Sequence, residues 1–124
     1  MAQIPDDVRR FILTSVPSVP YLEAMLLLRA GPAADWQATD LARRLYIPQQ
    51  KAEELLQQLV DAGFVSNEGP CWRWRPGPEG AALVDQLARI YADELVEVTE
   101  LIHTREERRA RQFADAFRLR KKEE

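Results

Sequence analysis

Two short helices joined by a turn are predicted for residues 39–65, whose sequence is TDLARRLYIPQQKAEELLQQLVDAGFV. Thr39 can cap the first helix, because its hydroxyl can accept a hydrogen bond from an otherwise unpaired backbone N–H. Tyr46-Ile47-Pro48 predicts a tight turn, since the residue before a proline avoids the α-helical region. From about residue 49 to residue 62 apolar side chains recur on one helical face, and Gly63 suits the left-handed position at which a helix ends.

A further helix precedes this unit and a β-hairpin follows it. Pro20 can start a strongly apolar helix that ends at Gly31-Pro32, and Trp36 is expected to pack beside the cap of the next helix. After Gly63 the apolar side chains alternate, and residues 71–75 (CWRWR) place both tryptophans on one face. We expect these tryptophans to pack the hairpin onto the helices, although they could instead form a stacking surface for single-stranded nucleic acid.

Helices are also predicted at both ends of the chain. Residues 4–14 carry apolar groups on one helical face, and a long amphipathic helix begins near residue 79 and continues to about residue 102. Thr104 and Glu107 have the spacing of a capping box, in which each residue bonds a backbone N–H of the other. We therefore expect a break near His103 and a last helix to about residue 119.

The length and composition fit one mainly α-helical domain with a small β-hairpin. We divide the 124 residues into an N-terminal helix (1–19), a central unit (20–78) and a C-terminal helical region (79–124). The first residues lack the pattern of a signal peptide, and no apolar stretch is long enough to span a bilayer. A single cysteine, Cys71, fits a reducing compartment. We therefore expect a cytoplasmic protein that does not associate with membranes.

Residue types that perform catalysis or hold metals are sparse. The single histidine, His103, has no nucleophile placed near it in the pattern of a catalytic triad. Neither it nor Cys71 belongs to a cluster with the spacing of metal ligands. The five glycines lie at element boundaries and form no phosphate-binding loop. We therefore expect neither an enzyme nor a cofactor or metal.

The central unit resembles bacterial winged helix-turn-helix regulators of the MarR and PadR type over roughly residues 20–76. The resemblance rests on a short helix ending in Leu-x-Ile, a turn, and a helix closing in Leu-x-x-Ala-Gly-Phe-Val before the hairpin. It implies a DNA-binding transcription regulator in which residues 49–62 are the recognition helix and the 66–75 hairpin is the wing. Tyr46 stands where such turns often carry glycine. Because a bulky residue tolerates a positive φ poorly, we expect this turn to differ in detail.

Side chains on the recognition helix, the helix before it and the wing are candidates for contact with double-stranded DNA. Glutamines at a helix start can read adenine edges, while lysines and arginines can contact phosphates or the minor groove. Each also has a plainer interpretation as a solvated side chain or, for the wing arginines, as a partner of Glu68. The candidates are Arg43, Arg44, Gln49, Gln50, Lys51, Gln57, Arg73 and Arg75.

The charge of the chain favours a second hypothesis. The whole chain has a net charge of −3, and Lys51 against Glu53, Glu54 and Asp61 leaves residues 48–62 with a net charge of −2. Carboxylates facing DNA are repelled by its phosphates, whose neutralisation dominates affinity. The alternative is therefore a winged-helix adaptor that binds another protein and not DNA.

The outer helices carry more apolar length than one small domain can cover, and the resemblance implies that they form a homodimer interface. The expected interface residues are Phe11, Leu87, Tyr91, Leu95, Val98, Ile102, Phe113 and Phe117. The arginine run of residues 105–111 could touch DNA or an acidic partner, or could be a solvated face paired with Glu106 and Glu107.

Overall fold

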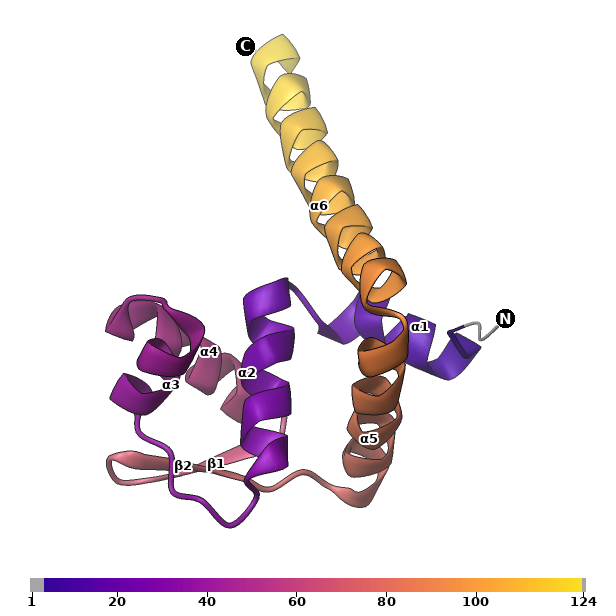
Figure 1. The fold of residues 1–124 in the computed structure, drawn as a ribbon. Coiled ribbons are helices and arrows are strands. Elements are labelled where there is room, and N and C mark those ends of the chain that lie inside the picture. The colour runs from indigo at the N-terminus through magenta and orange to yellow at the C-terminus, as the bar shows by residue number, and fades with distance from the viewer. Residues whose placement is uncertain (1–3, 124) are drawn as a thin grey trace.

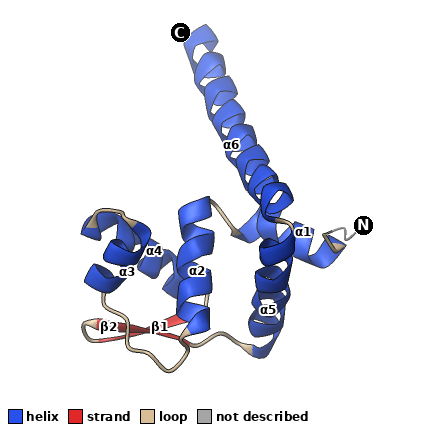
Figure 2. Cartoon of the chain, viewed as in Figure 1, coloured by secondary structure: helices blue, strands red, loops and turns tan. Residues whose placement is uncertain are grey.

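The fold was analysed in a computed structural model that describes residues 4–123, with side chains to residue 118. Six helices and a two-stranded antiparallel hairpin lie within this range (Figures 1 and 2). The chain is therefore mainly α-helical with one small hairpin, as the sequence predicts. In order, the elements are α1 (Asp6–Ser15), α2 (Val19–Ala30), α3 (Ala38–Leu45), α4 (Gln49–Asp61), β1 (Val65–Glu68), β2 (Cys71–Trp74), α5 (Pro78–Asp93) and α6 (Leu95–Glu123).

Helix α2 lies at the centre of the core. Its first turn is capped by Ser18, whose hydroxyl accepts a hydrogen bond from the backbone N–H of Tyr21 at 3.3 Å, and Pro20 occupies the position predicted for it. Leu22, Met25 and Leu28 are fully buried, which matches the strongly apolar composition of this segment. α2 packs against α3, α4 and β2, so the helix-turn-helix and the hairpin share one core with it.

The first helix of the helix-turn-helix begins two residues earlier than predicted. Gln37, and not Thr39, occupies the capping position, and its backbone N–H donates to Oδ2 of Asp40 at 3.2 Å. The prediction for Thr39 is wrong because Asp40, three residues after Gln37, can reach back to that N–H and so lets the helix start sooner. At the far end, Gly63 has φ 86°, which confirms its role in ending α4.

The turn between α3 and α4 contains a strained residue. Tyr46 has φ 56° and ψ 45°, the left-handed conformation that glycine commonly supplies at a helix end. The backbone N–H of Ile47 donates to the carbonyl of Ala42 at 3.0 Å and closes the turn. The expectation of a different turn is therefore wrong, because the tyrosine itself adopts the strained conformation.

The hairpin also pairs with one residue of the loop between α2 and α3. Val65 pairs with Trp74 and Glu68 with Cys71, while Trp36 forms an isolated antiparallel bridge to Trp72 through backbone hydrogen bonds of 2.8 and 2.7 Å. The bridge ties the α2–α3 loop to the wing. Trp36 was predicted to pack beside a helix cap, and this backbone contact with the wing was not predicted. Trp72 and Trp74 pack against the core, which confirms the structural interpretation of this pair.

The C-terminal helices differ most from prediction. The chain leaves helical geometry at Glu94 (φ −124°, ψ 49°), and α6 then runs without a break past His103. The predicted capping box does not form, because the Thr104 hydroxyl donates to the carbonyl of Glu100 at 2.9 Å inside the helix. The bend at Glu94 allows Leu87 of α5 and Ile102 of α6 both to be fully buried. The C-terminal part of α6 projects away from the other helices and the hairpin (Figure 1).

Helix α1 joins the two ends of the chain to the core. It packs against α5 and α6 and buries Val8, Phe11 and Ile12. No buried polar or charged residue occurs in the described part of the chain. Within the same range no single helix is long and apolar enough to cross a membrane; α1 and α2 meet that test only as a pair bent by 114°, and both helices contribute to the buried core.

Replacement of Gly80 by alanine should destabilise the fold. A β-carbon at Gly80 would lie 2.9 Å from Cε1 of Phe64, whose ring is only 7% exposed and is held by other aromatic rings. Overpacking of about 1–3 kcal/mol outweighs the helix propensity gained by alanine, about 1 kcal/mol. We expect the free energy of unfolding in urea to fall by about 1 kcal/mol. The control for steric contact is Gly77→Ala, whose β-carbon meets nothing within 4 Å; because Gly77 is the N-cap of α5, where alanine is less favourable, we expect a loss of about 0.5 kcal/mol. An equally stable or more stable Gly80→Ala variant would show that the ring can move.

Candidate nucleic-acid interface

Helix α4 presents a polar face to solvent because its buried residues follow the helical period. Ala52, Leu55, Leu56 and Leu59 face the core, whereas the outward side chains are exposed. The exposed set is Gln49, Gln50, Lys51, Glu53, Glu54, Gln57, Gln58 and Asp61. The predicted candidates on α4 are therefore accessible, and they share this face with three carboxylates.

Several of these candidates bond to carboxylates of the same helix. Nε2 of Gln49 donates to Oε1 of Glu53 at 3.4 Å, and Nε2 of Gln57 donates to Oδ1 of Asp61 at 3.0 Å. Nζ of Lys51 lies 3.9 Å from Oε2 of Glu54. Gln50 forms no side-chain hydrogen bond within the described residues. Only Gln50 therefore offers an uncommitted amide on the first turn of α4.

The wing arginines are also paired. Arg73 donates from Nε to Oδ1 of Asp35 at 3.0 Å and also contacts that oxygen through Nη2, and this hydrogen bond raises the pKa of the Arg73 guanidinium. Nη1 of Arg75 lies 3.6 Å from Oε1 of Glu68. Glu68 was predicted as the alternative partner of the wing arginines, and this is confirmed for Arg75. The sequence did not predict Asp35 as the partner of Arg73, because Asp35 lies next to the wing only through the Trp36–Trp72 bridge.

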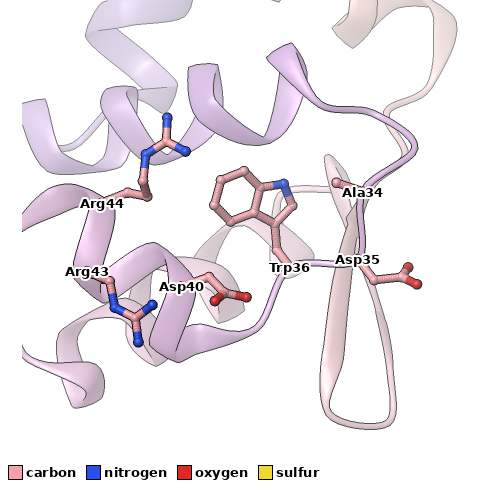
Figure 3. A pocket seen from close by; sticks show the side chains of 6 residues that line it. All are labelled: Ala34, Asp35, Trp36, Asp40, Arg43 and Arg44. Atoms are coloured by element: carbon pink, nitrogen blue, oxygen red, sulfur yellow. The ribbon is translucent and has the colours of Figure 1, made fainter.

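Arg43 and Arg44 are different. Both are exposed in the last turn of α3, where positive charge is favoured by the helix dipole. Neither forms a side-chain hydrogen bond or an ion pair within the described residues. They line a shallow hollow of about 300 Å³ beside Trp36, Asp35 and Asp40 (Figure 3). In Figure 3 the Asp35 carboxylate points away from the two arginines, consistent with its bond to the wing.

The arginine run after residue 104 is divided by the structure. Arg105 turns toward the body, where Nη2 donates to the carbonyl of Thr14 at 3.4 Å, and burial lowers the pKa of its guanidinium. Arg108, Arg109 and Arg111 are exposed along α6. Arg105 is therefore a link between α6 and the end of α1, and only the other three belong to the solvated face.

The predicted interface residues separate into two groups. Phe11, Leu87, Val98 and Ile102 are buried in the core of a single chain. Their burial leaves them no exposed surface to offer a second chain, because the bend at Glu94 folds both helices back onto α1. Tyr91 is half-buried, whereas Leu95, Phe113 and Phe117 are more than half exposed on α6. Val96 is 60% exposed and was missed, because the bend changes which face of the helix is outward.

Groups suited to metal binding are absent from the described residues, where no three His, Cys, Asp or Glu side chains converge. Cys71 is a free, half-buried thiol in the wing.

The comparisons with known proteins identify the fold. No family model matches the chain, and no curated protein matches it. Among solved structures, MepR, a transcription regulator of the Staphylococcus aureus multidrug efflux pump MepA, is similar with a TM-score of 0.53 and 14% identity, over 95% of this chain and 88% of that one. Together with the element order, this likeness shows that the chain has a winged helix-turn-helix fold with flanking helices.

Two mycobacterial structures are also similar. One is the solution structure of a homodimeric winged helix-turn-helix DNA-binding domain from Mycobacterium bovis, a possible ArsR-family transcriptional regulator; it has 22% identity and a TM-score of 0.49 over 77% of this chain and 94% of that one. The other is the crystal structure of a MarR family protein from Mycobacterium tuberculosis, with 18% identity and a TM-score of 0.48 over 94% of this chain and 84% of that one.

Proposed function

We propose that this protein is a DNA-binding transcription regulator of the winged-helix type that acts as a homodimer. The observation that carries the proposal is the pair Arg43 and Arg44, which are exposed and lack an intramolecular partner in the described chain. When a helix-turn-helix docks, its second helix enters the major groove while its first helix crosses the phosphate backbone. Arginines in the last turn of α3 then meet phosphates. MepR, which shares the fold, is itself a transcription regulator.

The remaining candidates differ in how much each is expected to contribute to DNA binding. Gln50 stands on the first turn of α4 with a free amide, the group that pairs with the N6 and N7 atoms of adenine. Arg73 and Arg75 reach DNA only after exchanging a carboxylate for a phosphate. Their contribution to affinity is therefore smaller than that of two arginines that begin unpaired.

A second candidate function is supported by the acidic face of α4. Glu53, Glu54 and Asp61 are exposed there beside a single lysine. Carboxylates on a recognition helix repel phosphates but suit a basic protein surface, which favours a protein-binding adaptor. The two functions differ in whether duplex DNA is bound at low salt.

The first prediction of the regulator proposal concerns salt dependence. The protein should bind a mixed-sequence duplex in fluorescence anisotropy at low salt, with log K falling as log salt rises. Arg43→Ala with Arg44→Ala should weaken binding and reduce the slope by about 1.8 for each bound protomer, because each lost phosphate contact removes about 0.9. Arg9→Ala with Arg10→Ala, which removes the same charge from exposed positions on α1, should leave the slope unchanged. Absence of wild-type binding, or of any salt dependence, would contradict the regulator and favour the adaptor.

The second prediction concerns the Asp35–Arg73 pair. Asp35→Asn removes a carboxylate that competes with phosphate for Arg73, so DNA affinity should rise and the salt slope should steepen by up to about 1 for each bound protomer. Addition of Arg73→Ala should abolish this gain. Asp85→Asn is the matched control, because it breaks a comparable exposed pair with Arg29 at 2.8 Å between α2 and α5. Equal affinity of Asp35→Asn and wild type would remove Arg73 from the proposed interface.

The homodimer is proposed from the apolar and charged pattern of α6. At 1.5 Å per residue its 29 residues span about 43 Å, and Leu95, Val96 and Phe113 are 52%, 60% and 76% exposed. Within α6, residues 95–104 carry two carboxylates and no arginine or lysine, whereas residues 106–118 carry four arginines and three carboxylates. Two antiparallel copies of α6 would bring these opposite charges together and cover the apolar side chains, as a two-fold symmetric interface requires.

The third prediction tests this interface by sedimentation. Wild-type protein should be dimeric at micromolar concentration, and Leu95→Ser with Phe113→Ser should shift it toward monomer, because the two changes remove apolar area from the shared surface. Gln112→Ser, at an exposed polar position on the same helix, is the control and should remain dimeric. A wild-type protein that sediments only as a monomer would exclude the dimer.

A further inference from the structure

We propose that Tyr46, in the turn between α3 and α4, is a phosphate-contacting residue of the DNA interface; this inference rests on the DNA binding proposed above. Tyr46 is 95% exposed and has a left-handed backbone conformation (φ 56°, ψ 45°). No other described residue apart from glycine has a positive φ.

The conformation is costly for this residue type. In the left-handed region the β-carbon of an L-residue crowds its own carbonyl oxygen, a clash that glycine lacks and that asparagine tolerates. Tyrosine therefore stores strain at a position where glycine or asparagine would relieve it. Strain of this kind persists where a side chain serves a function outside the local structure.

The fold uses the backbone of Tyr46 and not its side chain. The turn is closed by backbone N–H groups of Tyr46 and Ile47, which both donate to the carbonyl of Ala42. Leu45 and Ile47 on either side pack against the core. The phenol ring of Tyr46 makes no ring contact or hydrogen bond within the described residues. The identity of the side chain therefore contributes little to folding.

The position of the turn indicates what the ring meets. The first helix of a docked helix-turn-helix crosses the backbone and the start of the second helix reaches the bases, so the turn between them lies at the edge of the groove. A phenolic hydroxyl can donate to a phosphate oxygen, and tyrosine is among the residues that make such contacts. Arg43 and Arg44 precede the turn, while the carboxylates of α4 begin only at Glu53. Arg43 and Arg44 form no ion pair within the described residues, so their guanidinium groups can meet an anion at this end of the surface, where Asp35 and Asp40 line the same hollow.

Two substitutions separate the strain from the contact. Tyr46→Asn should raise the melting temperature by about 4 °C, because asparagine tolerates the left-handed conformation, yet it should weaken binding to the duplex about tenfold. Tyr46→Phe keeps the ring and removes the hydroxyl, so it should weaken binding to a similar extent with little change in stability. Neither should alter the salt slope, because a neutral hydroxyl releases no counterion. Arg43→Ala is the charged comparison and should reduce the slope by about 0.9 for each bound protomer.

Each result supports or overturns the inference. Weaker DNA binding by both variants, at an unchanged salt slope, supports it. Wild-type affinity in both variants overturns the Tyr46 contact and leaves the regulator in place. Loss of stability in Tyr46→Asn overturns it as well, because the ring would then be structural. A wild-type protein that binds no duplex at low salt overturns both the contact and the regulator.

Discussion

The ring of Phe64 is the contact on which the arrangement of the other elements depends. It stacks on Trp74 of the wing with centroids 5.8 Å apart and planes 6° apart, and it meets the ring of Phe11 on α1 edge-on at 5.9 Å. It also lies where a side chain at Gly80 of α5 would have to be. Phe64 directly follows the glycine that ends α4. Its ring thus fixes the wing, the N-terminal helix and the start of the C-terminal helices relative to the recognition helix. The elements proposed to face DNA and those proposed to form the dimer are positioned by the same aromatic cluster.

The charges on the candidate interface are balanced more closely than the fold alone requires. Carboxylates accompany Lys51, Arg73 and Arg75, whereas Arg43 and Arg44, alone among the candidate cations of this interface, form no ion pair within the described residues. Exposed pairs of this kind contribute about 0–1 kcal/mol to stability, so their main effect is on what the surface attracts. At the wing a phosphate would have to displace a bonded carboxylate, whereas at the end of α3 no carboxylate is bonded to the arginines, although Asp40 lines the same hollow. The balance favours weak, selective attraction of anions over a broadly basic surface.

The sequence predicts the parts of this fold that local chemistry determines. The helical period of residues 49–62, Gly63 and the alternation of residues 71–75 each correspond to an observed element. The bend at Glu94 could not be predicted, because no proline or glycine marks it and the apolar spacing continues through it; only packing of α5 and α6 onto α1 requires it. The prediction of Thr104 as a cap is wrong because its hydroxyl can form a hydrogen bond equally well inside a helix. At the site, the exposed candidates on α4 follow from periodicity, whereas the Asp35–Arg73 pair depends on a bridge between distant segments.

Residues that oppose local preference are concentrated away from the core. Tyr46 holds a strained backbone with its ring in solvent, and Phe113 exposes three-quarters of its side chain on a helix that leaves the body. Neither residue stabilises the single chain where it lies, while every buried position in the described chain is apolar. Because local propensity and packing agree at most other positions, these two exceptions are consistent with the proposed contacts to a second molecule. The two exceptions lie in different elements, one in the turn of the helix-turn-helix and one on the projecting helix α6. The proposed binding of DNA by one surface and of a second copy by another would require this separation.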